Sequence, residues 1–203
     1  PGGFEVVGPE GSHVASVRWM MPGAHNAENA LAAMLAARHA GVPLEVSAGA
    51  LSGFRGVKRR QEWIGTAAGV ELFDDFAHHP TAIARTLEAM RGGLGNGRLV
   101  AVLEPRSNTM RMGVHAATLG GSLAGADRIF VHAPPELGWD AANALRGLGR
   151  RARVSPGIDA LEAILLEELK AGDRVIMMSN GSFGGLHQRL LESLRERERR
   201  TGE

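Results

Sequence analysis

Cysteine and tyrosine are absent from this 203-residue sequence, and aromatic residues make up only 4% of it. Without cysteine the chain can form neither disulfides nor thiolate zinc sites, which fits a reducing cytoplasm. Few aromatic side chains and a formal net charge of +1 offer little for stacking bases or for attracting a phosphate backbone, so we expect no nucleic-acid partner. No apolar run approaches the ~20 residues that span a bilayer, and no signal peptide is evident. We therefore expect a cytoplasmic protein with no membrane partner.

The best-known nucleotide and metal motifs are also missing. There is no G-x-x-x-x-G-K-[ST] P-loop, no H-E-x-x-H zinc motif and no G-x-S-x-G elbow. Gly92–Gly97 follows a helical pattern and precedes a strand, the reverse of the order in a dinucleotide fingerprint, so it reads as a turn. His78 and His79 are adjacent and point in different directions, which makes them a poor pair of metal ligands. The sequence starts at Pro1 without Met, which indicates a piece of a longer protein.

From about residue 57 onward, short apolar runs alternate with helical patterns. Continuous apolar strands that alternate with helices are typical of a parallel sheet covered on both faces. We therefore expect an α/β fold, with a Rossmann-like, mostly parallel sheet and helices on both faces. The runs that predict strands are Val70–Phe73, Leu99–Leu103, Ile129–Val131, Ala152–Val154 and Val175–Met178. The helical patterns cover residues 81–91, 113–124, 139–148, 158–170 and 184–199.

The first 55 residues have a different organisation. Phe4–Val7 and Val14–Met20 are short apolar runs separated by turn residues, which predicts a β-hairpin. An isolated two-stranded hairpin is only marginally stable, so we expect this one to belong to a larger sheet. A basic, glycine-punctuated stretch follows residue 53. The sequence therefore predicts one domain over 1–55 and a second over 56–203.

Two helices are expected in the first of these domains. One covers the Ala- and Leu-rich run Ala30–Ala40, with Asn26 as its N-cap, and a shorter one covers Leu44–Leu51. Asn26 and Asn29 have two interpretations. They are either part of a capped helix, which this motif alone favours, or a pair of amides that offers donors and acceptors to a ligand such as adenine.

Polar side chains gather where the predicted strands end. Asp74, Asp75, His78 and His79 come directly after the first strand and before a helix. In open α/β sheets ligands bind at the carboxyl edge of the strands, and a helix N-terminus favours phosphate or carboxylate. The plainer interpretation is a set of helix caps and surface groups. Because several strand ends share this character, we interpret the edge as one face of a binding cleft. The polar residues after the other strands are Glu104, Arg106, Ser107 and Asn108, then His132, then Ser179, Asn180 and Ser182.

Five runs of the sequence resemble the Mur ligases, ATP-dependent enzymes that form amide bonds in peptidoglycan metabolism. The first run resembles the end of their central ATPase domain and the second resembles the linker into their C-terminal domain. The third is similar to the muramate:L-alanine branch, and the last two are similar to the branch that serves peptidoglycan recycling. The resemblance implies that residues 1–55 are a remnant of the central ATP-binding domain and that 56–203 form the peptide-binding domain. The runs are Gly23–Ala33, Phe54–Glu62, Asp74–Pro80, Glu104–Gly113 and Met178–Gly185.

The resemblance also implies a reaction, its cofactors and its partners. With ATP and Mg²⁺, the muramate carboxylate becomes an acyl phosphate, which the amino group of a peptide then attacks. The implied substrates are UDP-N-acetylmuramate and the murein tripeptide L-Ala-γ-D-Glu-meso-diaminopimelate. The implied partners also include the missing N-terminal and central domains of the same chain. Because the P-loop, the magnesium ligands and the UDP-sugar domain are absent, we expect no ligase activity from this chain alone.

Matched position by position, the motifs imply a site. Asn26 and Asn29 would face the adenine, and Arg60 would reach the ATP phosphates. Asp75 would bind the ribose hydroxyls, because a carboxylate can accept two O–H donors. The residues implied to line the peptide site are His78, His79, Arg106, Ser107, Asn108, Asn180 and Ser182, with Arg106 on a peptide carboxylate and His78 near the phosphate or the amine.

Three alternatives stay open at this point. The chain could belong to the L-alanine-adding branch of the same family. It could instead be a stand-alone α/β module that binds a nucleotide or a peptide without chemistry. The polar edge could also serve only for contacts between subunits.

Overall fold

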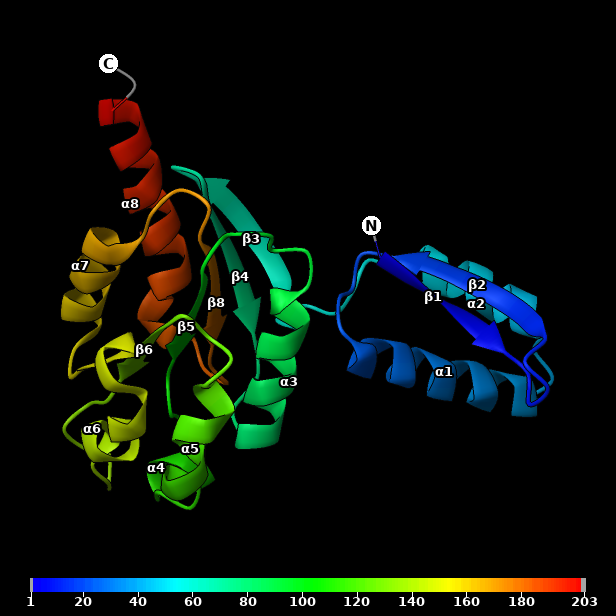
Figure 1. Ribbon diagram of the computed structural model, residues 1–203, viewed down its shortest axis with the longest axis horizontal. Coiled ribbons are helices and arrows are strands. Elements are labelled where there is room, and N and C mark those ends of the chain that lie inside the picture. The colour runs from blue at the N-terminus through cyan, green and yellow to red at the C-terminus, as the bar shows by residue number, and fades with distance from the viewer. Residues whose placement is uncertain (1, 202–203) are drawn as a thin grey trace. The chain divides into compact units, whose positions relative to one another are not determined.

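Residues 2–201 are described by the structure, a computed structural model (Figure 1). The chain divides into two units, Pro1–Lys58 and Arg59–Glu203. The identity of the two domains predicted over 1–55 and 56–203 stays a prediction. No helix among residues 2–201 has the length and apolar character needed to cross a membrane.

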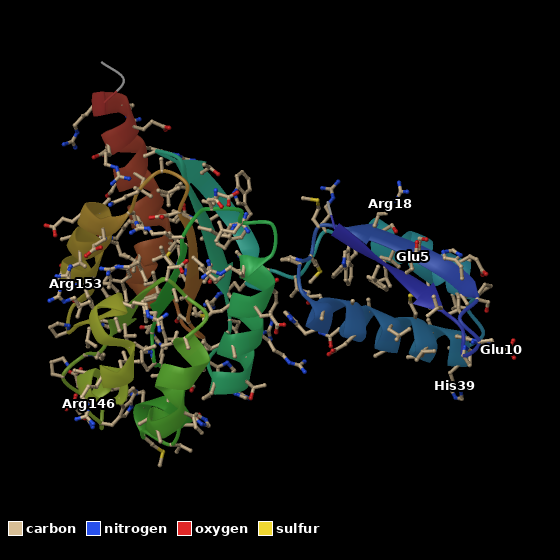
Figure 2. The ribbon with its side chains drawn as sticks, viewed as in Figure 1. Glu5, Glu10, Arg18, His39, Arg146 and Arg153 are labelled. Atoms are coloured by element: carbon tan, nitrogen blue, oxygen red, sulfur yellow. The ribbon has the colours of Figure 1, made fainter. Side chains whose placement is uncertain are left out.

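The first unit is an antiparallel hairpin packed against two helices. Val17 and Trp19 are buried and alternate with exposed residues along the second strand, so one face of the hairpin is apolar. That face packs on Ala30 and Met34 of the longer helix. The opposite face is polar, as Glu5 and Arg18 show in Figure 2. The elements are β1 (Gly2–Val7), β2 (His13–Trp19), α1 (Ala24–His39) and α2 (Leu44–Ser52).

The start of α1 corrects one prediction. The helix begins at Ala24, and the residue at its N-cap is Gly23, with a φ of 95°. Asn26 therefore lies in the first turn, and the prediction that it caps the helix was wrong. Its amide nitrogen donates to the carbonyl of Pro22 at 2.7 Å. Glycine adopts positive φ without a Cβ clash, so the chain can enter the helix earlier than the polar side chain suggests.

The second unit contains a six-stranded sheet in the order β3-β4-β8-β5-β6-β7. All neighbours are parallel except β3, which pairs antiparallel with β4. The predicted fold class, a mostly parallel sheet in an α/β domain, is confirmed. The strands are β3 (Glu62–Ala67), β4 (Val70–Asp75), β5 (Leu99–Leu103), β6 (Arg128–His132), β7 (Ala152–Ser155) and β8 (Arg174–Met178).

Helices cover both faces of this sheet, as Figure 1 shows. Along β5, Leu99 and Leu103 face one apolar core with α3 and α5, while Val100 and Val102 face a second core with α7 and α8. All five residues of β5 are fully buried, which explains why it reads as a continuous apolar run. The helices are α3 (Pro80–Arg91), α4 (Asn108–Arg111), α5 (Ala116–Leu123), α6 (Ala141–Ala144), α7 (Ile158–Glu168) and α8 (Leu186–Thr201), with 3₁₀ turns η1 (Arg146–Arg151) and η2 (Phe183–Gly185).

Two predicted helices are shorter or broken. The pattern over 113–124 forms a helix only from Ala116, and α4 precedes it as a separate turn. The pattern over 139–148 becomes α6 followed by η1, where Gly149 has a φ of 56°. Strand β3 was not predicted, because Gly65 lies in its middle and Trp63 is exposed, so it has no continuous apolar run.

Candidate functional site

The carboxyl ends of β4, β8 and β5 meet at one edge of the second unit. These three strands are neighbours, and in register Asp75 lies beside Met178, which lies beside Leu103. Hydrogen bonds continue past the strands. The Ser179 N–H donates to the carbonyl of Asp75 at 3.0 Å, and the Glu104 N–H donates to the carbonyl of Met178 at 3.0 Å. The segments that carry Asp75, Arg106 and Asn180 are thus fixed side by side, as their places after parallel strands predicted.

Glu104 and Ser179 hold the ends of β5 and β8 together. Both residues are buried, and the Ser179 hydroxyl makes a short hydrogen bond with Oε2 of Glu104. The same hydroxyl accepts from the Gly181 N–H at 2.9 Å. A carboxylate that accepts from a hydroxyl in a buried setting makes a strong hydrogen bond. The Glu104–Ser179 pair therefore sets the spacing of the two loops that follow.

Arg106 and Asn180 present opposite hydrogen-bonding character on these loops. The Arg106 side chain is 53% exposed, and its nearest carboxylate, that of Glu104, is 3.8 Å away. It lies across Gly181, where a Cβ would come within 2.4 Å of its Cδ. Oδ1 of Asn180 is buried and has no hydrogen-bond partner within the described residues. A guanidinium suits a carboxylate, and an unpaired amide oxygen suits an N–H donor.

Ser107 and Asn108 start the short helix α4 after Arg106. The Ser107 hydroxyl accepts from the Met110 N–H at 3.4 Å and so acts as the N-cap, while Asn108 is exposed. Trp139 donates from Nε1 to the carbonyl of Met110 at 2.6 Å and anchors this segment from another loop. The roles of Ser107, Asn108 and the exposed Ser182 in binding a peptide stay predictions. The sequence did not indicate Trp139.

Asp75 is only 3% exposed, and its carboxylate is already occupied. Oδ1 accepts from the Ala77 N–H at 2.7 Å and from the Thr86 hydroxyl at 3.4 Å, and Oδ2 accepts from the Gln61 N–H at 2.9 Å. Burial raises the pKa of the Asp75 carboxyl, although these N–H donors oppose the change. In this conformation Asp75 holds the backbone around it. Contact with ribose hydroxyls would require those bonds to open, and that role stays a prediction.

Two arginines at the start of the second unit lie beside Asp75. The guanidinium of Arg60 is over the ring of Phe76, 5.5 Å from its centroid, and the residue is exposed. Arg59 also lies over Phe76, at 5.3 Å, and pairs with Asp74 at 3.2 Å. An exposed guanidinium next to a strand-end edge suits phosphate. The phosphate role of Arg60 stays a prediction, whereas Arg59, for which the sequence indicated no role, is engaged within the protein.

The adjacent histidines differ in their contacts. Nδ1 of His78 is 3.0 Å from the carbonyl of Phe76, and His79 accepts from the Thr81 N–H at 3.2 Å as the N-cap of α3. Their rings are 89° apart, and His79 stacks on His115 at 5.9 Å. Within residues 2–201 no three His, Asp or Glu side chains are grouped so that they could hold a metal ion. The substrate roles of His78 and His79 stay predictions, and His115 was not foreseen.

Asn26 and Asn29 lie on the first turns of α1 in the first unit. Asn26 is 9% exposed and Asn29 is exposed. One helical turn separates them, so both side chains lie on the same side of the helix. Only Asn29 presents its amide openly, and the adenine role of both residues stays a prediction.

Comparisons with known proteins identify the family of this chain. A family model described as "Mur ligase, glutamate ligase domain" matches residues 59–181. The UDP-N-acetylmuramate–L-alanyl-γ-D-glutamyl-meso-2,6-diaminoheptandioate ligase of Escherichia coli K12 is 45% identical over 186 residues, which cover 91% of this chain and 41% of that protein. A UDP-N-acetylmuramate–L-alanine ligase of a Mycobacterium species is 36% identical over 195 residues, 92% of this chain and 40% of that protein. The chain thus spans about two fifths of the length of these relatives.

Solved structures give the same result. A crystal structure of a murein peptide ligase from Psychrobacter arcticus matches with a TM-score of 0.70 and 41% identity, over 89% of this chain and 39% of that one. A UDP-N-acetylmuramate–alanine ligase from Thermotoga maritima matches with a TM-score of 0.77 over 92% of this chain and 41% of that one, but at 23% identity it shows the fold alone. The family model covers more than half of the sequence, and its span includes every strand of the large sheet. The chain therefore belongs to the Mur ligase family, with the glutamate ligase domain of that family over residues 59–181.

Proposed function

We propose that this chain is the peptide-binding end of an ATP-dependent ligase that joins L-Ala-γ-D-Glu-meso-diaminopimelate to UDP-N-acetylmuramate in peptidoglycan recycling. The observation that carries the proposal is that the exposed Arg106 guanidinium lies across Gly181, next in the chain to Asn180, whose Oδ1 has no partner among residues 2–201. A peptide that ends in an amino acid with both a carboxylate and an amine offers a partner for each. The names of the relatives in Escherichia coli and Psychrobacter arcticus support this substrate over others.

In the proposed reaction, these residues bind and orient the peptide. Arg106 holds a carboxylate through charge-assisted N–H donors, and Oδ1 of Asn180 accepts from an N–H of the same ligand. Exposed Asn108 and Ser182 add donors and acceptors at the rim of the site. Fixing the peptide in one orientation presents its free α-amino group to the activated carboxyl and reduces the entropic cost of the step.

Some of the described residues suit ATP, but none of them form a group that suits Mg²⁺. Within the second unit, Arg60 is exposed and suits phosphate, whereas Asp75 is occupied by three internal hydrogen bonds. Within the first unit, Asn29 is exposed and its amide suits a base. Residues 2–201 offer no cluster of acidic side chains for magnesium, so no step is assigned to the metal here. Bound nucleotide would supply the phosphoryl group that activates the muramyl carboxylate.

Calorimetric titration of the 203-residue chain with the tripeptide tests the proposal. We expect the tripeptide to bind and L-alanine not to bind, and we expect Arg106→Ala to weaken binding by about tenfold to a hundredfold, the range for loss of a charged hydrogen-bonded pair. Arg146→Ala is the matched control, because Arg146 is equally an exposed arginine but lies in η1 (Figure 2). Binding of L-alanine in place of the tripeptide would point to the L-alanine-adding branch. We also expect the chain alone to form no product from ATP, UDP-N-acetylmuramate and tripeptide, and turnover would contradict this.

A further inference from the structure

Three side chains in contact connect the start of the second unit to the loop after β8. Nε of Arg59 is 3.2 Å from Oδ2 of Asp74, and Nε2 of His187 on α8 is 3.2 Å from Oδ1 of the same carboxylate. All three side chains are largely shielded, with exposures of 27%, 14% and 12%. We call Arg59, Asp74 and His187 the linker triad. Although burial acts against ionisation, His187 and Arg59 together hold the pKa of Asp74 below its ordinary value, so Asp74 is a carboxylate at neutral pH.

Arg59 connects the triad to the loop after β8 through Nη2 of its guanidinium. Nη2 donates to the carbonyls of Ser179 and Gly181, each at 2.6 Å. These two carbonyls belong to the residues on either side of Asn180, so one side chain fixes the Ser179–Asn180 and Gly181–Ser182 peptide planes. On the other side of the loop, the ring of Phe183 lies 6.0 Å from that of His187. The backbone that carries Asn180, whose Oδ1 has no partner among residues 2–201, is therefore held by a side chain from about 120 residues earlier in the chain.

The same arginine also fixes the backbone that leads to Arg60. The Arg59 N–H donates to Glu62 at 2.7 Å, and its carbonyl accepts from the Phe76 N–H at 2.9 Å. Arg59 and Gln61 both have positive φ, at 59° and 52°, which non-glycine residues rarely adopt. Such strain persists only where surrounding contacts over-determine the conformation, and it clusters at functional sites.

We propose that the linker triad is a positioning device, through which the segment carrying Arg60 and the loop carrying Asn180 are set in one conformation. Arg59 is the central member, because it alone touches both segments and the shared carboxylate of Asp74. The triad touches no substrate in this assignment. It acts through Asn180 on the peptide side and through Arg60 on the nucleotide side, and that part of the inference rests on the proposed function.

The chain contains a matched control for Arg59. Arg174 binds the carboxylate of Glu71 at 2.8 Å and donates to two carbonyls, those of Met90 and Gly92, at 3.0 and 3.2 Å. It also lies over a phenylalanine ring, that of Phe73, at 5.6 Å. Glu71 is on the same strand as Asp74, so the two arginines make equivalent sets of contacts near opposite ends of β4.

Amide hydrogen exchange of the 203-residue chain tests the triad without any substrate. In Arg59→Lys, one ammonium cannot reach both carbonyls and the carboxylate, so we expect the amides of residues 180–184 to exchange about tenfold faster, the factor expected for loss of one charge-assisted hydrogen bond. Arg174→Lys should leave these amides unchanged. Asp74→Asn should also speed the exchange of the amides of residues 180–184. If that variant fails to fold, the result for Arg59→Lys alone tests the proposal. Unchanged exchange at 180–184 in Arg59→Lys, or the same increase in Arg174→Lys, would overturn the proposal.

A kinetic test in the full-length ligase then separates the two proposals. For Arg59→Lys we expect the KM values of both the tripeptide and ATP to rise by about tenfold on the same reasoning, while the KM of UDP-N-acetylmuramate stays constant. A structural loss alone would lower the amount of active enzyme and leave all three KM values alone. Absence of tripeptide ligation in the unmodified enzyme would refute the proposed function and not the triad. Normal ligation with unchanged KM values in Arg59→Lys would refute the triad and not the function.

Discussion

Replacing Gly181 by alanine is the sharpest test of the proposed peptide site. An added Cβ would lie 2.4 Å from Cδ, 2.5 Å from Nε and 2.8 Å from Cζ of Arg106, far closer than carbon and nitrogen atoms can approach. No backbone atom is among these nearest contacts, and Gly181 does not need a positive φ. The methyl group should therefore displace the Arg106 side chain and leave the fold in place.

The magnitudes differ between stability and binding. Because Arg106 is half exposed and flexible, moving it should change the free energy of unfolding by less than about 0.5 kcal/mol. A carboxylate that loses its guanidinium partner should bind about 1.5–3 kcal/mol more weakly, which corresponds to roughly tenfold to a hundredfold in Kd. Gly181→Ala should thus reproduce the binding defect of Arg106→Ala without removing any charge.

Calorimetric titration with the tripeptide and urea unfolding measure these two quantities. Gly121→Ala is the control, because Gly121 lies in α5 with nothing within 4 Å of its added Cβ. It should bind the tripeptide normally and unfold at an equal or slightly higher urea concentration, since alanine favours helix. If Gly181→Ala bound the tripeptide as well as the unmodified chain while Arg106→Ala did not, the position of Arg106 across Gly181 would not be the one used in binding.

Three further changes test the surroundings of the site and the fold. Trp139→Phe removes the hydrogen bond to the carbonyl of Met110, and we expect a few-fold higher Kd for the tripeptide by calorimetry, since a net hydrogen bond contributes about 1 kcal/mol. Phe183→Ala empties a fully buried position and should lower the free energy of unfolding in urea by about 3–5 kcal/mol. Although burial acts to raise it, the pKa of Asp127 is held below 3.8 by Arg91, so the stability gained from this carboxylate is present above that pH and is lost as pH falls further. Urea midpoints should therefore show Asp127→Asn as less stable than the unmodified chain at neutral pH, with the difference closing below about pH 4.

The large sheet could be predicted from the sequence because its strands are buried on both faces. Leu99–Leu103 was placed without error, and the other runs were found within two residues, since continuous apolar runs leave little ambiguity. Edge strand β3 was not predicted because Trp63 is exposed and Gly65 interrupts its apolar pattern. Gly23 displaced the expected cap at Asn26 because glycine can adopt a backbone conformation that no side-chain pattern reveals.

The common edge at which these strands end could be predicted from the sequence, whereas the contacts along that edge could not. The sequence predicted that the segments carrying Arg106 and Asn180 lie side by side, because parallel strands end at a common edge. The sequence could not predict the hydrogen-bond partners of Arg59, Glu104 and Trp139, because these bonds join residues that are 120, 75 and 29 positions apart. The local sequence pattern carries no information on pairs so far apart in the chain. The position of Glu104 directly after a predicted strand did place it at the polar edge of the sheet.

Hydrogen-bond occupancy separates the polar residues of this edge into two groups that a motif cannot distinguish. Asp75 and Ser107 have their oxygens filled by backbone N–H donors, so they hold loops in shape. The side chains of Arg106 and Arg60 are exposed, and Oδ1 of Asn180 has no partner within the described residues, so these groups retain capacity for a ligand. A buried acceptor left empty costs free energy unless a donor reaches it. In the proposed peptide complex we therefore expect the Asn180 oxygen to accept from an N–H of the ligand, which an amine-bearing peptide offers and a phosphate or a simple carboxylate does not.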